Sequence, residues 1–295
     1  MQIASSQISW EMLAPLLLML LLGLVLAVAG LSRGRFAPPG YLGYFWIFLL
    51  VCVVTDFLSF TPAVWLMAIV SFRALREYFS LVDLRLEDRW GILGAYLSIP
   101  FMIYLIQIGW YGFFIVSIPV YAFIVIPFLV TLGDSQGHGS LLSIGAIDFG
   151  LFFFVYCLGH IAYLVYFSTW LVLLLLLAVG ACNVARALTA RRGRIPGFVL
   201  SCLVCLALTL GLRSWTLVPT GPAVFLGFLI PVLVQMGDYT VGVLERDLGI
   251  SEADLEPGRG RVLDSLKSYL FTAPIVFHYL RWTMKFGELI HRHGN

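Results

Sequence analysis

The sequence has 295 residues, of which 61% are hydrophobic and only 12% are charged. Ordinary soluble domains carry roughly 25% charged residues. A soluble globular fold is therefore excluded, because it could not bury this much apolar surface. The net charge of +2 provides no strong field for nucleic acid, and we expect no nucleic-acid partner.

Long apolar segments recur along the chain, and a membrane helix needs about 20 largely apolar residues. They predict an all-α integral membrane protein, a polytopic bundle of about nine or ten transmembrane helices with a long cytoplasmic polar loop before the last apolar segment. The region 41–72 contains either two spans or a helical hairpin broken near Pro62. The expected spans are 12–30, 41–57, 60–72, 91–109, 112–132, 141–163, 166–187, 197–212 and 216–236, followed by a short apolar segment at 269–282.

Arginines gather in the segments that follow the first, third, seventh and ninth expected spans. Basic residues mark the cytoplasmic side of a membrane protein, and parity places these four groups on the same side. The intervening connections carry almost no basic residues. We therefore expect a protein of a bacterial cytoplasmic membrane with the polar loop 237–268 in the cytoplasm.

The charge pattern divides the chain into three parts. Residues 1–72 form N-terminal transmembrane helices, residues 73–90 form a charged cytoplasmic connector, and residues 91–295 form a transmembrane domain that includes the loop 237–268. A long mixed-charge loop on a compact membrane protein is a reasonable place for chemistry. The alternative is a solvated connector.

Two carboxylates lie at the ends of this loop. Asp238 follows the ninth expected span, and Asp264 precedes the last apolar segment, so both can approach the same membrane surface. Paired carboxylates commonly bind Mg²⁺ beside substrate phosphates. Between them, Gly260 allows backbone N–H groups to approach a phosphate, and Arg259 and Arg261 can neutralise it. The alternatives are an interfacial residue that ends a helix and a basic tight turn.

The segment from Gly237 to Leu280 resembles the C-terminal signature of the phosphatidate cytidylyltransferase (CDP-diacylglycerol synthase) family. A fainter likeness extends back to residues 74–79 and to Gly159-His160, so the resemblance covers roughly residues 70–282. The residues that match at the family's spacing are Gly237, Asp238, Arg246, Pro257, Gly258, Gly260 and Asp264.

This resemblance implies a transferase of phospholipid biosynthesis that converts CTP and phosphatidate to CDP-diacylglycerol and pyrophosphate. The implied ligands are CTP, phosphatidate or another anionic phospholipid, and Mg²⁺ as the cofactor. Asp238 and Asp264 would be catalytic and would bind the metal together with Asn183. The phosphates would be bound by loop residues and by the arginine cluster after the seventh span: Arg191, Arg192, Arg194, Arg246, Arg259, Gly260 and Arg261.

The sequence also departs from the family pattern. The family's Glu and Ser after the first Asp are Val241 and Gly242, and the last Asp of its signature is Lys267. Asn183 lies near an acidic position, and a lysine at a metal-ligand position repels the ion. We therefore expect weak or altered catalysis. The alternative is a non-catalytic paralogue that binds phospholipid or nucleotide, or partners a lipid-synthesis enzyme. The sequence decides neither whether the chain is an enzyme nor whether it forms a homodimer.

Asp148 lies inside the sixth expected span, and an acid within a membrane segment is a functional candidate. It supports a third alternative, a transporter, although an acid near a shifted helix end would look the same. We expect Asp148 to face the protein interior, because an unpaired acid in hydrocarbon is costly. His160 lies over three turns further along the same predicted helix, so the two residues need not share a site.

Overall fold

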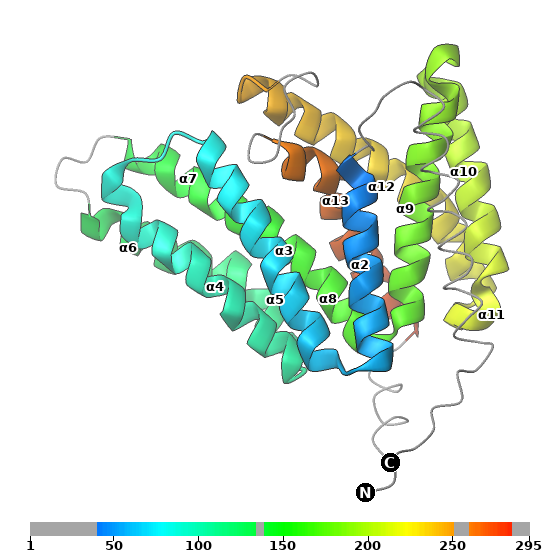
Figure 1. The fold of residues 1–295 in the computed structure, drawn as a ribbon, viewed down its shortest axis with the longest axis horizontal. Helices are drawn as coiled ribbons and strands as arrows, with labels where there is room; N and C mark the ends of the chain where they lie inside the picture. The colour runs from blue at the N-terminus through cyan, green and yellow to red at the C-terminus, as the bar shows by residue number, and fades with distance from the viewer. Residues whose placement is uncertain (1–39, 134–138, 251–259, 285–295) are drawn as a thin grey trace, which may run out of the picture.

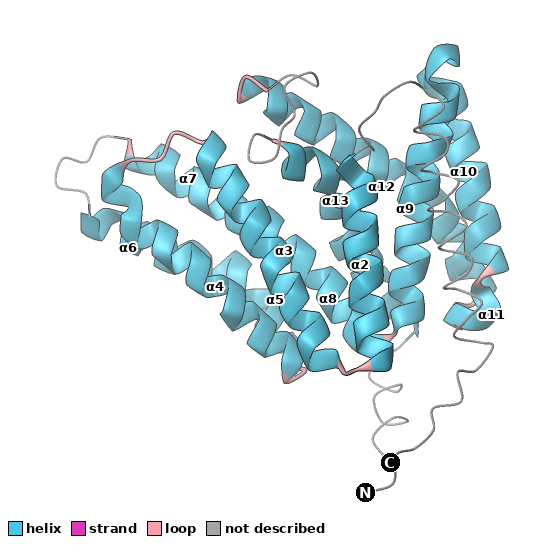
Figure 2. Ribbon diagram, in the orientation of Figure 1, coloured by secondary structure: helices cyan, strands magenta, loops and turns pink. Residues whose placement is uncertain are grey.

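A computed structural model describes residues 40–133, 139–250 and 260–284. In these ranges the elements are helices packed side by side (Figures 1 and 2). Six helices of the described part are long and apolar enough to cross a membrane. This confirms the predicted class, an all-α polytopic membrane protein. The expected span 12–30 lies outside the described residues, and the total of nine or ten spans remains a prediction.

The first two described helices are α2 (Gly40–Phe57) and α3 (Phe60–Leu81). Only Leu58 and Ser59 separate them, so region 41–72 contains two helices joined by a short turn. Neither helix is among the six candidate spans, and the two alternatives for this region remain predictions. Pro62 lies in the first turn of α3, where the missing N–H costs no helical hydrogen bond. The helix passes through residue 72, so the first part of the predicted charged connector is helical. The proposed three-part division of the chain remains a prediction.

Two long helical segments of the bundle each contain one π-helical turn, which widens the helix locally and rotates the residues that follow. One of these helical segments covers the expected span 112–132, and the other covers the expected span 141–163. The elements of this part of the chain, in order, are η1 (Leu86–Asp88), α4 (Arg89–Gln107), α5 (Tyr111–Val116), η2 (Ser117–Ala122), α6 (Phe123–Gly133), α7 (Ser140–Leu151), η3 (Phe152–Cys157) and α8 (Leu158–Phe167).

The second half of the chain surrounds α9 (Thr169–Thr189), the most deeply buried of the six candidate spans. Cys182 of α9 lies against α10, with 3.2 Å between its sulfur and that of Cys205. Helix α12 in turn crosses α10 closely at Gly227, where a Cβ would lie 2.8 Å from the Cα of Leu206. The remaining elements are η4 (Ala190–Arg192), α10 (Arg194–Gly211), α11 (Arg213–Thr216), α12 (Thr220–Asp247) and α13 (Arg261–Met284).

The polar loop predicted at 237–268 is largely helical. Helix α12 continues to Asp247, and α13 begins at Arg261. The prediction was wrong about the extent of the loop, because charge marks where the hydrocarbon ends and not where a helix ends. Outside lipid, a charged helix is solvated and its backbone remains hydrogen-bonded. The end of α9, the start of α10, the end of α12 and the start of α13 lie toward the upper side in Figure 1.

Candidate functional site

Charged side chains of α9, α12 and α13 meet at this upper side. Asp238 of α12 forms an ion pair through Oδ2 with Nη1 of Arg186 on α9. Its Oδ1 accepts a hydrogen bond from Ser268 Oγ on α13, at 3.0 Å. Arg186 Nη2 also donates to Asn183 Oδ1 at 2.7 Å. Asp238 therefore connects three helices, and both of its oxygens have partners.

Gly237 brings the backbones of α12 and α13 together beside Asp238. A Cβ at this position would lie 2.5 Å from the carbonyl oxygen of Lys267 and 3.2 Å from the ring of Phe271. A larger residue would separate the helices, because the obstructing atom belongs to the backbone. The glycine thus fixes the crossing that places Ser268 against Asp238.

The second predicted carboxylate, Asp264, lies in the first turn of α13. It forms an ion pair through Oδ1 with Lys267 of the same helix. Asp238 and Glu245 of α12 also act electrostatically on the Lys267 ammonium. Lys267 is therefore influenced electrostatically by Asp264 of its own helix and by two carboxylates of α12. The prediction that Asp238 and Asp264 form one site remains a prediction; the contact of Asp238 with α13 is to Ser268, the residue after Lys267.

A cavity of about 410 Å³ opens beside Asp238 and Arg186. Its lining includes a second cation, Arg194, at the start of α10, and the polar side chains of Gln235 and Tyr239. Two guanidinium groups and one carboxylate face this space, so it is suited to an anion. Arginine binds phosphate especially well, because its planar fork can donate two parallel hydrogen bonds.

Glu77 anchors the start of α13 from α3. Its Oε1 accepts hydrogen bonds from the backbone N–H groups of Val262, at 2.6 Å, and Leu263, at 3.4 Å. The first N–H groups of a helix have no partner inside the helix, and a carboxylate there is also favoured by the helix dipole. This buried contact fixes the turn that carries Asp264.

The other predicted phosphate-binding residues are placed in different ways. Arg191 and Arg192 are exposed in η4, and Arg246 is exposed near the end of α12, where its Nε donates to the carbonyl of Gly242. Arg261 is the first residue of α13. Gly260 has a φ of 86° and accepts the N–H of Asp264 at 2.9 Å. Arg259 lies outside the described residues.

Asp148 and His160 do not belong to this site. Asp148 lies in the interior, as predicted, with 3% of its surface exposed, and its carboxylate oxygens have no hydrogen-bond partner among the described residues. His160 is fully buried and faces His278 of α13, with 3.2 Å between the two Nε2 atoms. Neither the family resemblance nor the transporter hypothesis predicted that Asp148 and His160 share a site. The structure does not bring the two side chains together.

The predicted metal ligands do not present a ready Mg²⁺ site. Both Asp238 oxygens and the Asn183 oxygen are bonded to protein donors, and Asp264 pairs with Lys267. Among the described residues there is no group of three or more His, Cys, Asp and Glu side chains placed to hold a metal ion. Mg²⁺ prefers several free oxygen ligands in near-octahedral geometry. The donor set therefore does not fit the ion in this arrangement.

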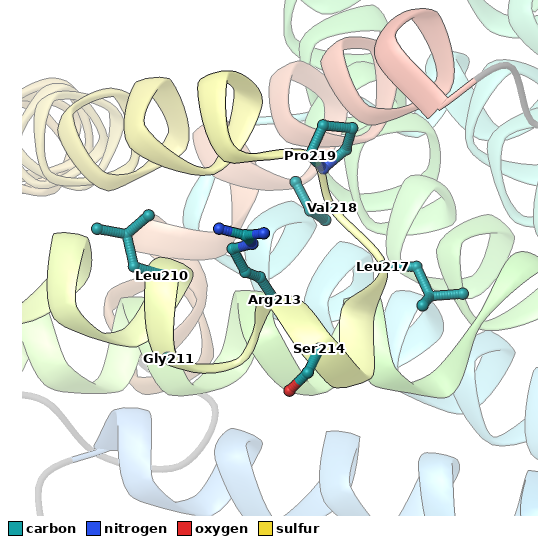
Figure 3. Close-up of a pocket in the computed structure, with 7 residues that line it drawn as sticks. All are labelled: Leu210, Gly211, Arg213, Ser214, Leu217, Val218 and Pro219. Carbon is teal, nitrogen blue, oxygen red and sulfur yellow. The ribbon is translucent and has the colours of Figure 1, made fainter.

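A second cavity of about 490 Å³ lies at the opposite end of α10. Figure 3 shows the Arg213 side chain pointing into the space between Leu210 and Val218. The lining residues include no carboxylate, and one serine, Ser214, accompanies the arginine. This cavity lacks the paired charges of the first.

Sequence reasoning missed three members of the site. Arg186 lies inside the expected seventh span, and its spacing of three residues from Asn183 was the available signal. Ser268 lies one turn after Asp264, which also places it on the same face of α13. Glu77 lies in the segment of fainter family likeness, but its partners are backbone N–H groups.

The fold and site define a helical integral membrane protein with a charged, phosphate-compatible cavity at one end of its bundle. Comparison of the sequence with known proteins identifies its family. A model of the cytidylyltransferase family matches residues 190–283, the region that contains Arg194, Asp238 and nearly all of α13. The "Uncharacterized protein YnbB" of Escherichia coli is 30% identical over 238 residues, which cover 73% of this chain and 78% of that protein. The chain belongs to the cytidylyltransferase family.

Two further relatives match over shorter stretches. A phosphatidate cytidylyltransferase of Synechocystis is 41% identical over 56 residues, or 19% of each chain. "Phosphatidate cytidylyltransferase 4, chloroplastic" of Arabidopsis thaliana is 29% identical over 92 residues, which cover 30% of this chain and 24% of that protein. The match thus spans a quarter or less of each of these two relatives. No solved structure shows significant similarity to the chain.

Proposed function

We propose that this protein binds the phosphate head group of a phosphatidate-type lipid in the cavity beside Asp238 and transfers a cytidylyl group to it from CTP. A lipid phosphate oxygen would attack the α-phosphorus of CTP. The bond to the β-phosphate would break, and pyrophosphate would leave. The names of two relatives supply the substrate class, and the family match includes most of the residues that line the cavity.

The observation that carries this proposal is the charge arrangement at the membrane boundary. Arg186 and Arg194 line a cavity next to a carboxylate that is fixed by bonds from two other helices. Fixed cations can stabilise the charge that develops on transferring phosphates, and each such contact can contribute orders of magnitude in rate. In the proposed orientation this end of the bundle faces the cytoplasm of a bacterial cell, where CTP would enter.

A second candidate function is binding without turnover. The ion pairs Arg186–Asp238 and Lys267–Asp264 favour it, because they use internally the charges that phosphates would otherwise engage. Such a protein would hold a phospholipid or a nucleotide, or accompany a lipid-synthesis enzyme. Arginine contacts to a phosphate need no turnover, so binding can persist where catalysis is lost.

One experiment separates the two functions. The purified protein in nanodiscs that contain phosphatidate is supplied with labelled CTP, with and without Mg²⁺, and CDP-diacylglycerol is measured. Turnover that falls in Asp264→Asn supports the transferase. Absence of turnover together with phosphatidate binding that falls in Arg194→Ala supports the binding protein.

Arg213→Ala is the matched control, because Arg213 lines the cavity at the other end of α10. Equal losses in Arg194→Ala and Arg213→Ala would contradict both forms of the proposal. Absence of both turnover and phosphatidate binding in the parent protein would contradict them as well.

A further inference from the structure

Arg186 is a cation whose orientation is set by two different kinds of acceptor. Its Nη1 forms an ion pair with the carboxylate of Asp238 on α12, and its Nη2 donates to the amide oxygen of Asn183 at 2.7 Å. Asn183 lies three residues earlier on α9, so the two side chains share one face of that helix. The Nε of Arg186 is buried without a hydrogen-bond partner among the described residues. Within this part of the chain, Asn183 and Asp238 therefore fix the plane of the guanidinium group.

A second arginine, Arg194 of α10, lines the same cavity of about 410 Å³. The two helices approach closely here, because a Cβ at Gly197 would lie 2.7 Å from Thr189 Oγ1 and 3.5 Å from the Cα of Arg186. Arg194 precedes Gly197 by three residues, about one turn of α10. The close approach brings both cations to one cavity, and Asp238 is the single acidic residue of its lining.

An amide and a carboxylate hold an arginine with different consequences for its charge. The carboxylate of Asp238 compensates the charge of the guanidinium group, whereas the amide of Asn183 accepts a hydrogen bond and carries no charge. An incoming anion competes with Asp238 for the same cation, but it does not compete electrostatically with a neutral acceptor. Asn183 is only 8% exposed, so little water reaches its bond to Arg186. The amide can therefore hold Arg186 in place while this cation changes its anionic partner.

We propose that Asn183 is a positioning residue for anion binding. It holds Arg186 at the wall of the cavity without neutralising it, so the guanidinium group can bind the phosphate of the ligand together with Arg194. Two arginines and one aspartate give the lining one net positive charge, and Asn183→Asp would cancel that charge. This role replaces the metal-binding role that the family pattern implied for Asn183. It rests on the proposed function, because it needs an anionic ligand in the cavity.

Binding of a short-chain phosphatidate to the purified protein in detergent, measured by isothermal titration calorimetry without Mg²⁺, tests this role. Asn183→Asp keeps an oxygen acceptor but adds a negative charge, and we expect binding to weaken at least about tenfold, as on loss of one charge-assisted contact. Asn183→Leu removes the acceptor at similar volume. We expect it to weaken binding about fivefold, because Arg186 must then be ordered when the ligand binds.

The same titration in the Arg186→Ala background separates positioning from a general structural effect. There Asn183→Leu should change the affinity by less than about twofold, because the cation that Asn183 positions is absent. Ser201→Ala is the matched control. Ser201 is buried on α10, and its hydroxyl donates to the backbone carbonyls of Gly197 and Cys182, so its loss should leave phosphatidate affinity within about twofold. Size-exclusion profiles and thermal unfolding check that each variant is folded, and Asn183→Asp decides if Asn183→Leu is not.

Three outcomes would overturn the role of Asn183. Equal losses from Asn183→Leu with and without Arg186 would show that the amide does not act through this arginine. A loss in Ser201→Ala as large as that in Asn183→Leu would show a structural effect alone. Unchanged or tighter phosphatidate binding in Asn183→Asp would show that neutrality at this position is not needed.

Failure of the proposed function gives a different result. If the parent protein binds no phosphatidate, the proposed function fails, and the positioning role fails with it. If the parent protein binds phosphatidate and the affinity is insensitive to both Asn183→Asp and Asn183→Leu, only the positioning role fails.

Discussion

Two groups of polar residues lie along α13, and they are built in opposite ways. Near its start, Asp264 pairs with Lys267, and Ser268 bonds to Asp238 of α12, which in turn pairs with Arg186 of α9. About 15 Å further along the helix, at 1.5 Å per residue, His278 meets His160 in a group of aromatic rings. One group contains ion pairs beside a cavity, whereas the other consists of hydrogen bonds among aromatic side chains.

The hydrogen bonds of the histidine group define a single chain of donors. A carbonyl oxygen only accepts, so His160 Nδ1 carries the proton that reaches Tyr156 O at 2.8 Å. The Nε2 of a neutral His160 then accepts from His278 Nε2. His278 Nδ1 in turn accepts from the hydroxyl of Tyr111, at 3.2 Å. Every ring nitrogen is used, and the group needs no ligand.

The difference between the groups shows that buried polarity alone does not identify a functional site. Arg186 and Arg194 face open volume, so the charged group can exchange a protein partner for a ligand. His160 has no such freedom, because it is fully buried and packs edge-on against Phe114 and Phe277. The following predictions test whether function follows the first group and stability alone follows the second.

The largest expected effect is on turnover. If the protein is a transferase, Asp238→Asn removes the charge that positions Arg186, and CTP-dependent product formation should fall by at least about 100-fold, as for other fixed electrostatic groups. The matched control is Asp247→Asn, an exposed acid at the end of the same helix. Equal activity of the two variants would remove Asp238 from the site.

Gly237→Ala tests the helix crossing that supports the charged group. The new Cβ would collide with the Lys267 carbonyl, and overpacking of this kind costs roughly 1–3 kcal/mol. Thermal unfolding in detergent should show a lower midpoint. Gly242→Ala, five residues further along α12, meets no atom within 4 Å and should stabilise the helix by about 0.5–1 kcal/mol. If Gly237→Ala does not lower the unfolding midpoint relative to Gly242→Ala, α12 and α13 do not touch at Gly237.

Glu77→Gln should weaken the start of α13. The neutral amide still accepts a hydrogen bond but loses the charge that favours a helix N-terminus, so we expect a cost of about 1 kcal/mol. The exposed Glu87→Gln serves as control. Hydrogen exchange at Val262 and Leu263 measures the effect locally, and unchanged exchange in Glu77→Gln would contradict the anchor.

The smallest effect is expected in the histidine group. His278→Phe leaves His160 Nε2 without its donor and should cost about 1 kcal/mol of stability. CTP turnover or lipid binding, whichever the parent protein shows, should remain within about twofold, a change of less than 1 kcal/mol. A larger loss of function would show that the two groups of α13 are coupled, and the comparison would fail.

Much of the fold was accessible from the sequence, because lipid imposes simple rules. Apolar runs located the helices, and family spacing pointed to Asp238 and Asp264. The ends of α3 and α12 were misjudged, because a charged helix looks like a loop once it leaves hydrocarbon. The role of Glu77 could not be predicted from the sequence, because its partners lie 185 and 186 positions away. These partners are backbone N–H groups, which almost every residue carries, so no residue type marks them.

The span of α12 before Asp238 has a consequence for how a lipid would be handled. From Thr220 to Gly237 the helix contains no charged residue, and this stretch measures about 27 Å at 1.5 Å per residue, close to the ~30 Å of the hydrocarbon layer. If this stretch crosses the hydrocarbon layer, Asp238 lies at the depth of phospholipid head groups. A lipid phosphate could enter the cavity while its acyl chains stay in their leaflet, so the protein avoids the ~0.8 kcal/mol per CH₂ that withdrawing them into water would cost.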